Sequence, residues 1–147
     1  MDMITTHGIF LMDNMNRILL VHATNGRWNQ WSIPKGLGDD GETSLNSAMR
    51  ELAEETNIDI QTLMELHGYE YSALGTCKYK SGNKQLEGHL FKIHSNLSER
   101  ELNLKCESMV GDTNIPECDQ HSWYELSVAL DKMHEAQSRL LKEHLKL

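Results

Sequence analysis

The chain has 147 residues, of which 39% are hydrophobic and 24% charged, a balance that predicts one folded globular domain over residues 1–147 rather than a disordered chain. No apolar run approaches the roughly 20 residues of a membrane helix, and the N-terminus carries an acid where a secretory signal is basic, so neither membrane insertion nor export is expected. With 22 acidic against 14 basic residues, the formal net charge of −8 disfavours binding to duplex DNA through its phosphates.

The three cysteines, Cys77, Cys106 and Cys118, form no Cys-x-x-Cys pair. Neither a disulfide framework nor a zinc site is therefore expected, and the reducing cytoplasm is the expected compartment. An acidic protein can still act on phosphates when a divalent cation stands between the two negative charges, so a cluster of acids is a candidate metal site.

The first half of the chain predicts a hairpin followed by a long loop. Residues 4–12 and 17–23 are apolar, strand-like runs on either side of a polar turn. Residues 24–42 contain four glycines and a proline, and they are expected to be mostly loop.

Residues 44–56 form the strongest predicted helix of the first half. Thr43 or Ser44 can cap its N-terminus, and Asn57 is expected to end it in left-handed geometry, which asparagine tolerates better than most residues. Its apolar side chains recur on one stripe with the helical period: Leu45, Ala48, Met49, Leu52, Ala53 and Thr56.

The second half predicts further strands and one more helix. Residues 68–80 and 85–94 read as two strands around a short turn, and residues 95–115 are irregular and polar. Residues 123–126 are a short strand candidate, and residues 127–146 predict a second helix. Strands interleaved with two helices predict an α/β fold, in which a mixed sheet lies between helices.

The helix at residues 44–56 carries an unfavourable cluster of like charges. Glu51, Glu54 and Glu55 stand at spacings of three and four residues, where like charges destabilise a helix by roughly 0.2–0.5 kcal/mol a pair. Helical counting places the three carboxylates within an arc of about 100° opposite the apolar stripe, with the small Ser47 inside that arc. Hard oxygen donors of this kind suit Mg²⁺ or Mn²⁺, and a solvated acidic face is the alternative.

The residues around this cluster have a characteristic spacing, and those that match are Gly36, Glu42, Arg50, Glu51, Leu52, Glu54, Glu55 and Ile58. The pattern resembles the Nudix box, Gly-x5-Glu-x7-Arg-Glu-U-x-Glu-Glu-x-Gly-U, in which U is a bulky aliphatic residue. Eight of the nine fixed positions match, and the departure is Asn57, where the family has glycine. Asparagine is the substitute that costs least at a left-handed position, so the change removes no chemical group.

The resemblance extends beyond the box to roughly residues 4–145. Residues 8–23 are similar to the opening hairpin of the family, and WSIPKG at residues 31–36 is similar to its WxxPKG segment. IPECDQHSW at residues 115–123 is similar to the Pro-Glu-x5-Trp region that precedes the last strand and helix in several branches. The resemblance thus implies a Nudix fold.

The resemblance also implies a site for Mg²⁺ or Mn²⁺. The metal ligands of the family would fall on three acids of the box and one backbone carbonyl: Glu51, Glu54, Glu55 and Gly36. Outside the box, Glu117 matches an acid that some members use as a further ligand or as the base, with a plain surface turn as the alternative. Glu87 is the second candidate for this outside carboxylate.

Further roles follow from the same resemblance. Arg50 occupies the position whose guanidinium orients the carboxylates, a role that overlaps with that of a surface ion pair. Glu42 would act through water or hold Arg50. One of Glu51, Glu54 and Glu117 would take the proton as water attacks the phosphate.

Candidates for substrate contacts are one lysine and several aromatic residues. Lys35 would face the phosphates as in similar dinucleoside-polyphosphate hydrolases, or it is a solvated turn lysine. Trp28, Trp31, Tyr71 and Tyr79 can stack on a base or pack in the core. The lysines at residues 78, 80 and 84 fit a solvated hairpin edge better than a contact with phosphate or RNA.

The resemblance implies hydrolysis of a nucleoside diphosphate linked to another group. Dinucleoside polyphosphates and 5′-triphosphate RNA ends are the expected substrates, so the expected partners are a nucleotide or an RNA 5′ end. ADP-ribose, nucleotide sugars and nucleoside triphosphates are alternatives. An alternative of another class is a regulatory module that binds a nucleotide without turnover, which degraded box glutamates would favour, whereas here they are intact.

Overall fold

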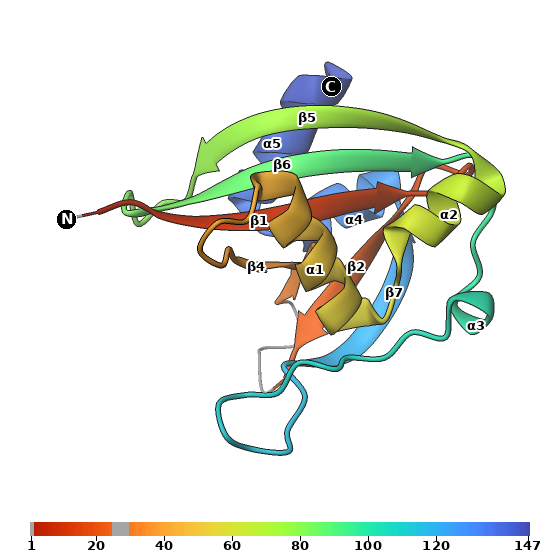
Figure 1. Cartoon of the computed structure of the whole chain (residues 1–147). Coiled ribbons are helices and arrows are strands. Elements are labelled where there is room, and N and C mark those ends of the chain that lie inside the picture. The colour runs from red at the N-terminus through yellow and green to blue at the C-terminus, as the bar shows by residue number, and fades with distance from the viewer. Residues whose placement is uncertain (1, 25–29) are drawn as a thin grey trace.

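Strands are interleaved with helices along the chain, as the sequence predicts. Two short strands, β3 (Trp31–Ser32) and β4 (Lys35–Leu37), lie within the stretch that was expected to be loop. The computed structural model, which describes residues 2–24 and 30–147, contains the elements that follow (Figure 1): β1 (Ile4–Met12), β2 (Arg17–Ala23), β3 (Trp31–Ser32), β4 (Lys35–Leu37), α1 (Ser44–Thr56), α2 (Ile60–His67), β5 (Tyr69–Lys78), β6 (Lys84–Ile93), α3 (Glu99–Leu102), β7 (Cys118–Glu125), α4 (Leu126–Lys132) and α5 (Glu135–Leu145).

One mixed sheet forms the centre of the molecule. Five strands lie in the order β3-β2-β1-β6-β5, while β4 pairs with β1 and β7 pairs with β2. β1 and β6 run parallel over the whole of β1, from the pair Ile4–Lys84 to the pair Met12–Lys92, and the other pairings are antiparallel. The predicted hairpin is present, and its strands pair at the closed end, where Met12 lies opposite Ile18.

Helices cover both faces of this sheet, α1 and α2 on one and α4 and α5 on the other (Figure 1). Successive side chains of a strand point to opposite faces. Ile9 and Leu11 therefore join the core beneath α1 and α2, whereas Phe10 and Met12 join the core beneath α4 and α5. The expected fold class, a mixed sheet between helices, is confirmed.

The acid-bearing helix α1 forms where it was predicted. Thr43 is its N-cap, and the side-chain oxygen accepts a hydrogen bond from the N–H of Asn46 at 3.1 Å. Asn57 ends the helix with φ of 67°, and its N–H donates to the carbonyl of Ala53 at 2.8 Å. Leu52 is fully buried against the sheet, which fixes the rotation of the helix and hence the direction of its acids.

The prediction of a single helix over residues 127–146 is wrong. The chain breaks at Met133 and His134 into α4 and α5, and Nδ1 of His134 accepts a hydrogen bond from the N–H of Ala136 at 3.2 Å. The helical period of apolar residues continues through the break because both helices pack on the same core. The apolar pattern alone therefore could not reveal it.

Three further elements differ from the prediction, and one of them is the four-residue helix α3, which lies in the stretch expected to be irregular. The helix α2 was missed: it has only eight residues, it is capped by Asp59, and only Ile60 and Leu63 of it are buried, too few for a periodic signal. Strand β7 begins before residues 123–126, because its pairing with β2 extends it toward Cys118. No helix in the described part of the chain is long and apolar enough to cross a membrane.

Candidate active site

A cavity of about 550 Å³ opens beside α1 and brings together residues from β1, β4, β6 and the segment that precedes β7. Five residues singled out from the sequence line it: Lys35, Gly36, Glu51, Glu54 and Glu117. The other lining residues are Ile4, Thr6, Leu37, Lys84 and Ser108. Among the described residues, the cavity is therefore lined by three acidic residues and two lysines.

Gly36 allows β4 to pass directly against the carboxyl group of Glu51. A β-carbon on residue 36 would lie 2.1 Å from Cδ and 2.2 Å from Oε2 of Glu51, distances at which the atoms collide. The strand is held in place because Gly36 pairs with His7 of β1. The first glycine of the box is thus required by a close approach of backbone to side chain.

Arg50 bridges the acids of α1. Its Nη1 lies 3.0 Å from Oε1 of Glu51 and 3.0 Å from Oε1 of Glu54. Its Nε lies 3.0 Å from Oε2 of Glu42, and its Nη2 donates to the carbonyl of Leu37 at 2.9 Å. The bond from Arg50 holds the pKa of Glu42 at about 2. The guanidinium thus offsets the repulsion among the carboxylates and fixes their orientation.

Two of the acids are buried, although helical counting placed them opposite the apolar stripe. Glu55 is 5% exposed and Glu51 is 8% exposed. Oε2 of Glu55 accepts a hydrogen bond from the N–H of Lys35 at 3.2 Å, and the thiol of Cys118 lies 3.7 Å from Oε1. Burial raises the pKa of Glu55 to about 8, and burial together with the charge of Glu54 raises the pKa of Glu51. A nearby cation would favour the charged form of both groups.

The donor set suits a divalent cation. The carboxyl groups of Glu51, Glu54 and Glu117 line one cavity with the backbone of Gly36, and Mg²⁺ and Mn²⁺ prefer hard oxygen donors of this kind. Within residues 2–24 and 30–147, no three acidic, histidine or cysteine side chains are arranged as a ready metal site.

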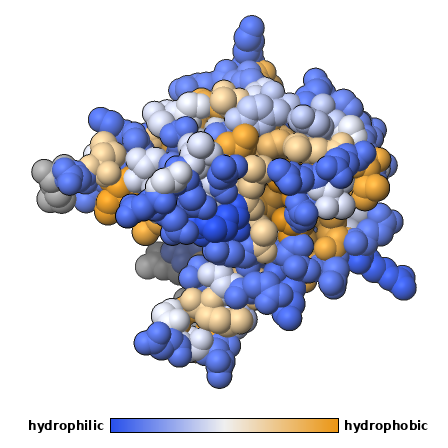
Figure 2. Space-filling view, in the orientation of Figure 1, coloured by the Kyte–Doolittle hydropathy of each residue, from blue (hydrophilic) through white to orange (hydrophobic). Residues whose placement is uncertain are grey.

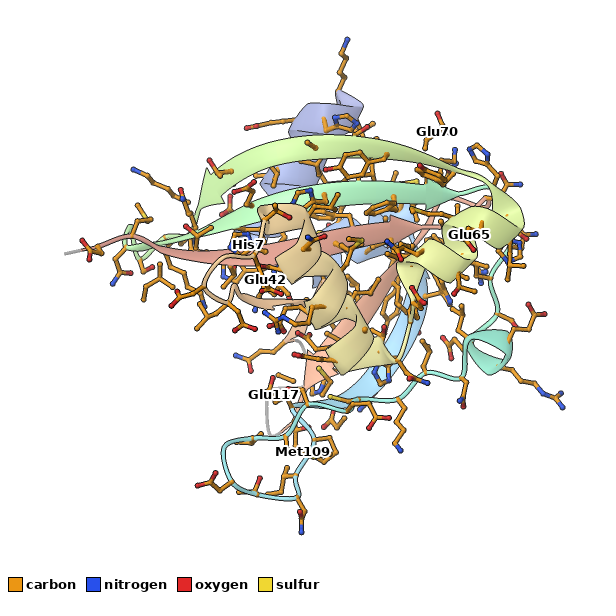
Figure 3. All side chains as sticks on the ribbon, in the orientation of Figure 1. His7, Glu42, Glu65, Glu70, Met109 and Glu117 are labelled. Atoms are coloured by element: carbon orange, nitrogen blue, oxygen red, sulfur yellow. The ribbon has the colours of Figure 1, made fainter. Side chains whose placement is uncertain are left out.

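Glu117, rather than Glu87, is the outside acid that reaches the cavity. The N–H of Glu117 donates to the carbonyl of Ser108 at 2.8 Å, and the N–H of Ser108 donates to the carbonyl of Glu54 at 3.2 Å. Glu87 pairs with His7 across β1 and β6, and it is absent from the described residues that line the cavity. Figure 3 shows Glu117 near α1, with Met109 farther out on the same loop.

The loop at residues 108–117 projects from the body of the molecule (Figure 1). A bridge between Met109 and Pro116 closes its base, and the N–H of Val110 donates to the carbonyl of Ile115 at 2.8 Å. The side chains of Met109, Val110 and Ile115 are exposed and form a more apolar patch on this projection, whereas the surface over α1 is hydrophilic (Figure 2).

Trp31 and Tyr79 pack in the core, which is the alternative to base stacking that the sequence left open for them. Trp31 is 8% exposed, and its ring centroid lies 5.2 Å from that of His22 and 5.3 Å from that of Tyr124. Tyr79 is 9% exposed, and its ring centroid lies 4.6 Å from that of His134. Rings buried in this way present no open face to a base.

Tyr71 is exposed but lies away from the cavity. Its hydroxyl group is 2.7 Å from Nδ1 of His89, and its ring stacks on His89 and packs against Phe91. Trp28 lies outside the described residues. No aromatic side chain is among the described residues that line the cavity, so the expected stacking contact has no counterpart there.

Lys84 was expected on a solvated hairpin edge, yet it lines the cavity. The parallel pairing of β1 with β6 sets Lys84 opposite Ile4. Burial and the charge of Lys35 lower the pKa of Lys84, which indicates that the two amines are close enough to interact. No local sequence pattern reveals this proximity, because the pairing joins distant parts of the chain.

The protein is thus an α/β domain in which two acids of one helix line a cavity together with two lysines. A family model described as "NUDIX domain" matches residues 4–144, and the chain belongs to the Nudix family. Hydrolases of this family generally use divalent metal ions.

Individual relatives resemble the chain to different extents. The asymmetrical bis(5′-nucleosyl)-tetraphosphatase of Rattus norvegicus is 41% identical over 64 residues, which is 43% of this chain and 43% of the rat protein. The RNA pyrophosphohydrolase of Pelagibacter ubique is 28% identical over 130 residues, which is 84% of this chain and 77% of that protein. A solved structure of an Ap4A hydrolase from C. elegans shares the fold, with a TM-score of 0.67, 21% identity and coverage of 96% of each chain. The match to the rat protein thus spans less than half of its length.

Proposed function

We propose that this protein is a Mg²⁺- or Mn²⁺-dependent pyrophosphohydrolase that cleaves a phosphoanhydride bond in a nucleoside diphosphate linked to another group. The observation that carries the proposal is the cavity in which Glu51, Glu54 and Glu117 stand beside Lys35 and Lys84. Carboxylates alone would repel a phosphate chain, and amines alone would bind it without the means to activate water. Together, the acids and the lysines can bind a phosphate chain and activate water.

Dinucleoside polyphosphates and 5′-triphosphate RNA ends are the substrates we favour. The similarity to a bis(5′-nucleosyl)-tetraphosphatase and to an RNA pyrophosphohydrolase supports this choice. Two amines in the cavity also suit a substrate with several consecutive phosphates, because one amine can remain on the outer phosphates while another faces the scissile bond. ADP-ribose, nucleotide sugars and nucleoside triphosphates are the alternative substrates.

The residues that would hold the metal ion are the acids of the site and one backbone carbonyl: Glu51, Glu54, Glu55, Glu117 and Gly36. When bound, a divalent ion neutralises phosphate charge and makes the phosphorus more electrophilic. Arg50 donates to Oε1 of Glu51, which leaves Oε2 of Glu51 without that contact and available to the ion, while Glu54 would be a ligand where Glu51 or Glu117 is the base. Glu55 would first have to exchange its hydrogen bond from Lys35 for the metal.

Glu54 is the residue to which we assign the role of general base. Its side chain is 39% exposed, and Arg50 fixes its Oε1 at 3.0 Å, which orients Oε2 toward a proton. Water attacks phosphorus in line, its proton passes to Glu54, and the bond from phosphorus to the bridging oxygen breaks. The departing phosphate keeps the electron pair of that bond. Glu51 and Glu117 are the alternative bases.

A panel of nucleotides tests the proposal. The protein is incubated with Mg²⁺ and, in turn, diadenosine tetraphosphate, a 5′-triphosphate RNA oligonucleotide, ADP-ribose and ATP, and the products are separated by anion-exchange chromatography. Hydrolysis in ¹⁸O-labelled water then identifies the phosphorus attacked. We expect turnover of at least one of the first two compounds and its loss in EDTA. Activity that survives the chelator would refute metal dependence, and tight nucleotide binding without turnover would indicate a regulatory module.

A further inference from the structure

We propose that Gln137 of α5 is a positioning residue that sets the location of both amines in the cavity, Lys35 and Lys84. This inference rests on the proposed function, because its consequence is a change in phosphate binding. Gln137 lies on the opposite side of the sheet from α1 and is absent from the described residues that line the cavity. It acts through its neighbours.

The side-chain amide of Gln137 is fully buried and has three hydrogen bonds. Oε1 accepts from the N–H of Ile33 at 3.1 Å. Nε2 donates to the hydroxyl group of Ser32 at 2.9 Å and to that of Tyr79 at 3.3 Å. Both donor hydrogens and one acceptor site are thus used inside the core, where a polar group without a partner is unfavourable.

The first branch of this network leads to Lys35. Ile33 stands two residues before Lys35 and three before Gly36, and its N–H bond to Gln137 holds the start of this segment. The N–H of Lys35 then donates to Glu55, and Gly36 lies against Glu51. Any shift of residues 32–34 would therefore move an amine and the backbone that packs against the acids.

The second branch leads to Lys84. The N–H of Tyr79 donates to the carbonyl of Lys84 at 2.9 Å, and Nζ of Lys84 lies 5.7 Å from the centroid of the Tyr79 ring. The hydroxyl group of the same tyrosine is held by Gln137. One amide therefore joins the two chain segments that carry the amines, although these segments are far apart in the sequence and belong to different strands.

Gln137→Met is the most direct test, because it nearly conserves the side-chain volume and removes all three hydrogen bonds. The buried N–H of Ile33 then has to reach water or another acceptor, and both lysines shift. For a preferred substrate of the panel we expect Gln137→Met to raise KM about tenfold, the size of one lost charge-assisted contact, with kcat changed less than about threefold.

Leu141→Ala is the matched control. Leu141 is fully buried in the same helix and packs in the same core, so its truncation lowers Tm through a cavity without breaking the network. We expect Leu141→Ala to leave KM unchanged. If Gln137→Met lowers Tm and also leaves KM unchanged, Gln137 is only a core residue and the inference is overturned.

Tyr79→Phe separates the two branches, because it removes the hydroxyl group and keeps the ring. We expect a smaller rise in KM than for Gln137→Met, and a double variant no worse than Gln137→Met alone, since the second branch is already broken. If the rise in KM of the double variant equals the two single effects combined, Tyr79 does not act through Gln137. That result would overturn the link to Lys84.

Amide hydrogen exchange keeps this inference separate from the proposed function, because it requires no turnover. In Gln137→Met we expect protection to fall at residue 33 and in residues 35–37 and 79–84, while the amides of β7 stay protected. Binding of inorganic tripolyphosphate, measured by calorimetry, should weaken about tenfold in parallel. Unchanged exchange at these segments would overturn the inference even if hydrolysis were demonstrated. If amide protection and tripolyphosphate binding change in Gln137→Met but the wild-type protein hydrolyses no nucleotide, only the proposed function is refuted.

Discussion

The backbone N–H of Lys35 donates a hydrogen bond to Oε2 of Glu55, with 3.2 Å between the two atoms. This bond ties the C-terminal part of α1 to β4. The carboxyl group is 5% exposed, and burial raises its pKa to about 8. Without a divalent ion, the folded protein therefore holds this group largely protonated at neutral pH.

The metal-free protein is expected to lose stability as the pH rises from about 4.5 to about 8. In this interval the unfolded chain has released the proton of Glu55 while the folded chain retains it, so a rise in pH favours unfolding. Below the interval both states hold the proton, and above it neither does. The free energy of unfolding, measured with denaturant in EDTA across this range, checks the sign. Glu55→Gln should flatten the dependence, and an unchanged slope would assign it to other groups.

Gly36→Ala should reduce turnover while leaving most of the sheet intact. The added β-carbon would stand 2.1 Å from Cδ of Glu51, so the carboxyl group must leave its place. A displacement of about 1 Å at a catalytic group can lower the rate about a hundredfold. We expect kcat to fall by that order, with a far-ultraviolet circular dichroism spectrum like that of the wild type. A normal rate would show that the position of Glu51 is not critical.

Glu54→Gln tests the proposed base. The amide keeps the size of the side chain but takes no proton, so kcat should fall by about a hundredfold or more. Glu87→Gln is the matched control, because Glu87 is an acid of β6 outside the described lining of the cavity and should have a nearly normal rate. Steady-state kinetics on one substrate compare the two. Equal losses, or a loss for Glu87→Gln alone, would contradict the assignment.

Asn57 offers a test of stability at the one box position that departs from the family pattern. Its φ is 67°, and its Nδ2 donates to the carbonyl of Asn103 at 3.2 Å. Asn57→Gly should change the free energy of unfolding by less than about 0.5 kcal/mol, because glycine adopts this geometry freely. Asn57→Ala should destabilise by about 1 kcal/mol or more, because alanine is strained there. Urea unfolding of both variants distinguishes this explanation from loss of the side-chain bond, which would affect them equally.

The parts of the fold that the sequence predicts well are those with strong local patterns. Helix α1 begins at the capping threonine and ends at the asparagine as expected, and Ala48, Leu52 and Thr56 of its predicted apolar stripe are buried. The break between α4 and α5 was missed because the apolar period runs through Met133, and α2 was missed because it is short. A local pattern indicates which face of a helix or strand is apolar, but it does not indicate where a helix is broken.

At the site, the sequence predicts which residues of the box gather and that Arg50 orients them, but not which of the acids are buried. The spacing of the box brings Gly36, Glu51 and Glu54 to one cavity, whereas the burial of Glu55 depends on its contacts with Lys35 of β4 and Cys118 of β7. Lys84 reaches the cavity through pairing between distant strands. The positions of Glu55 and Lys84 are set by tertiary contacts between distant segments, which the sequence of one segment does not indicate.

The start of the loop that carries Glu117 is bound to the backbone of α1. The carbonyl of Glu54 accepts the N–H groups of both Glu107 and Ser108, while the tip, with Val110 and Ile115, lies out in solvent. Insertions or deletions at residues 111–114 would lengthen or shorten the projection without loosening that anchor. The length of the tip can therefore change while the backbone bonds of residues 107 and 108 to α1 stay in place.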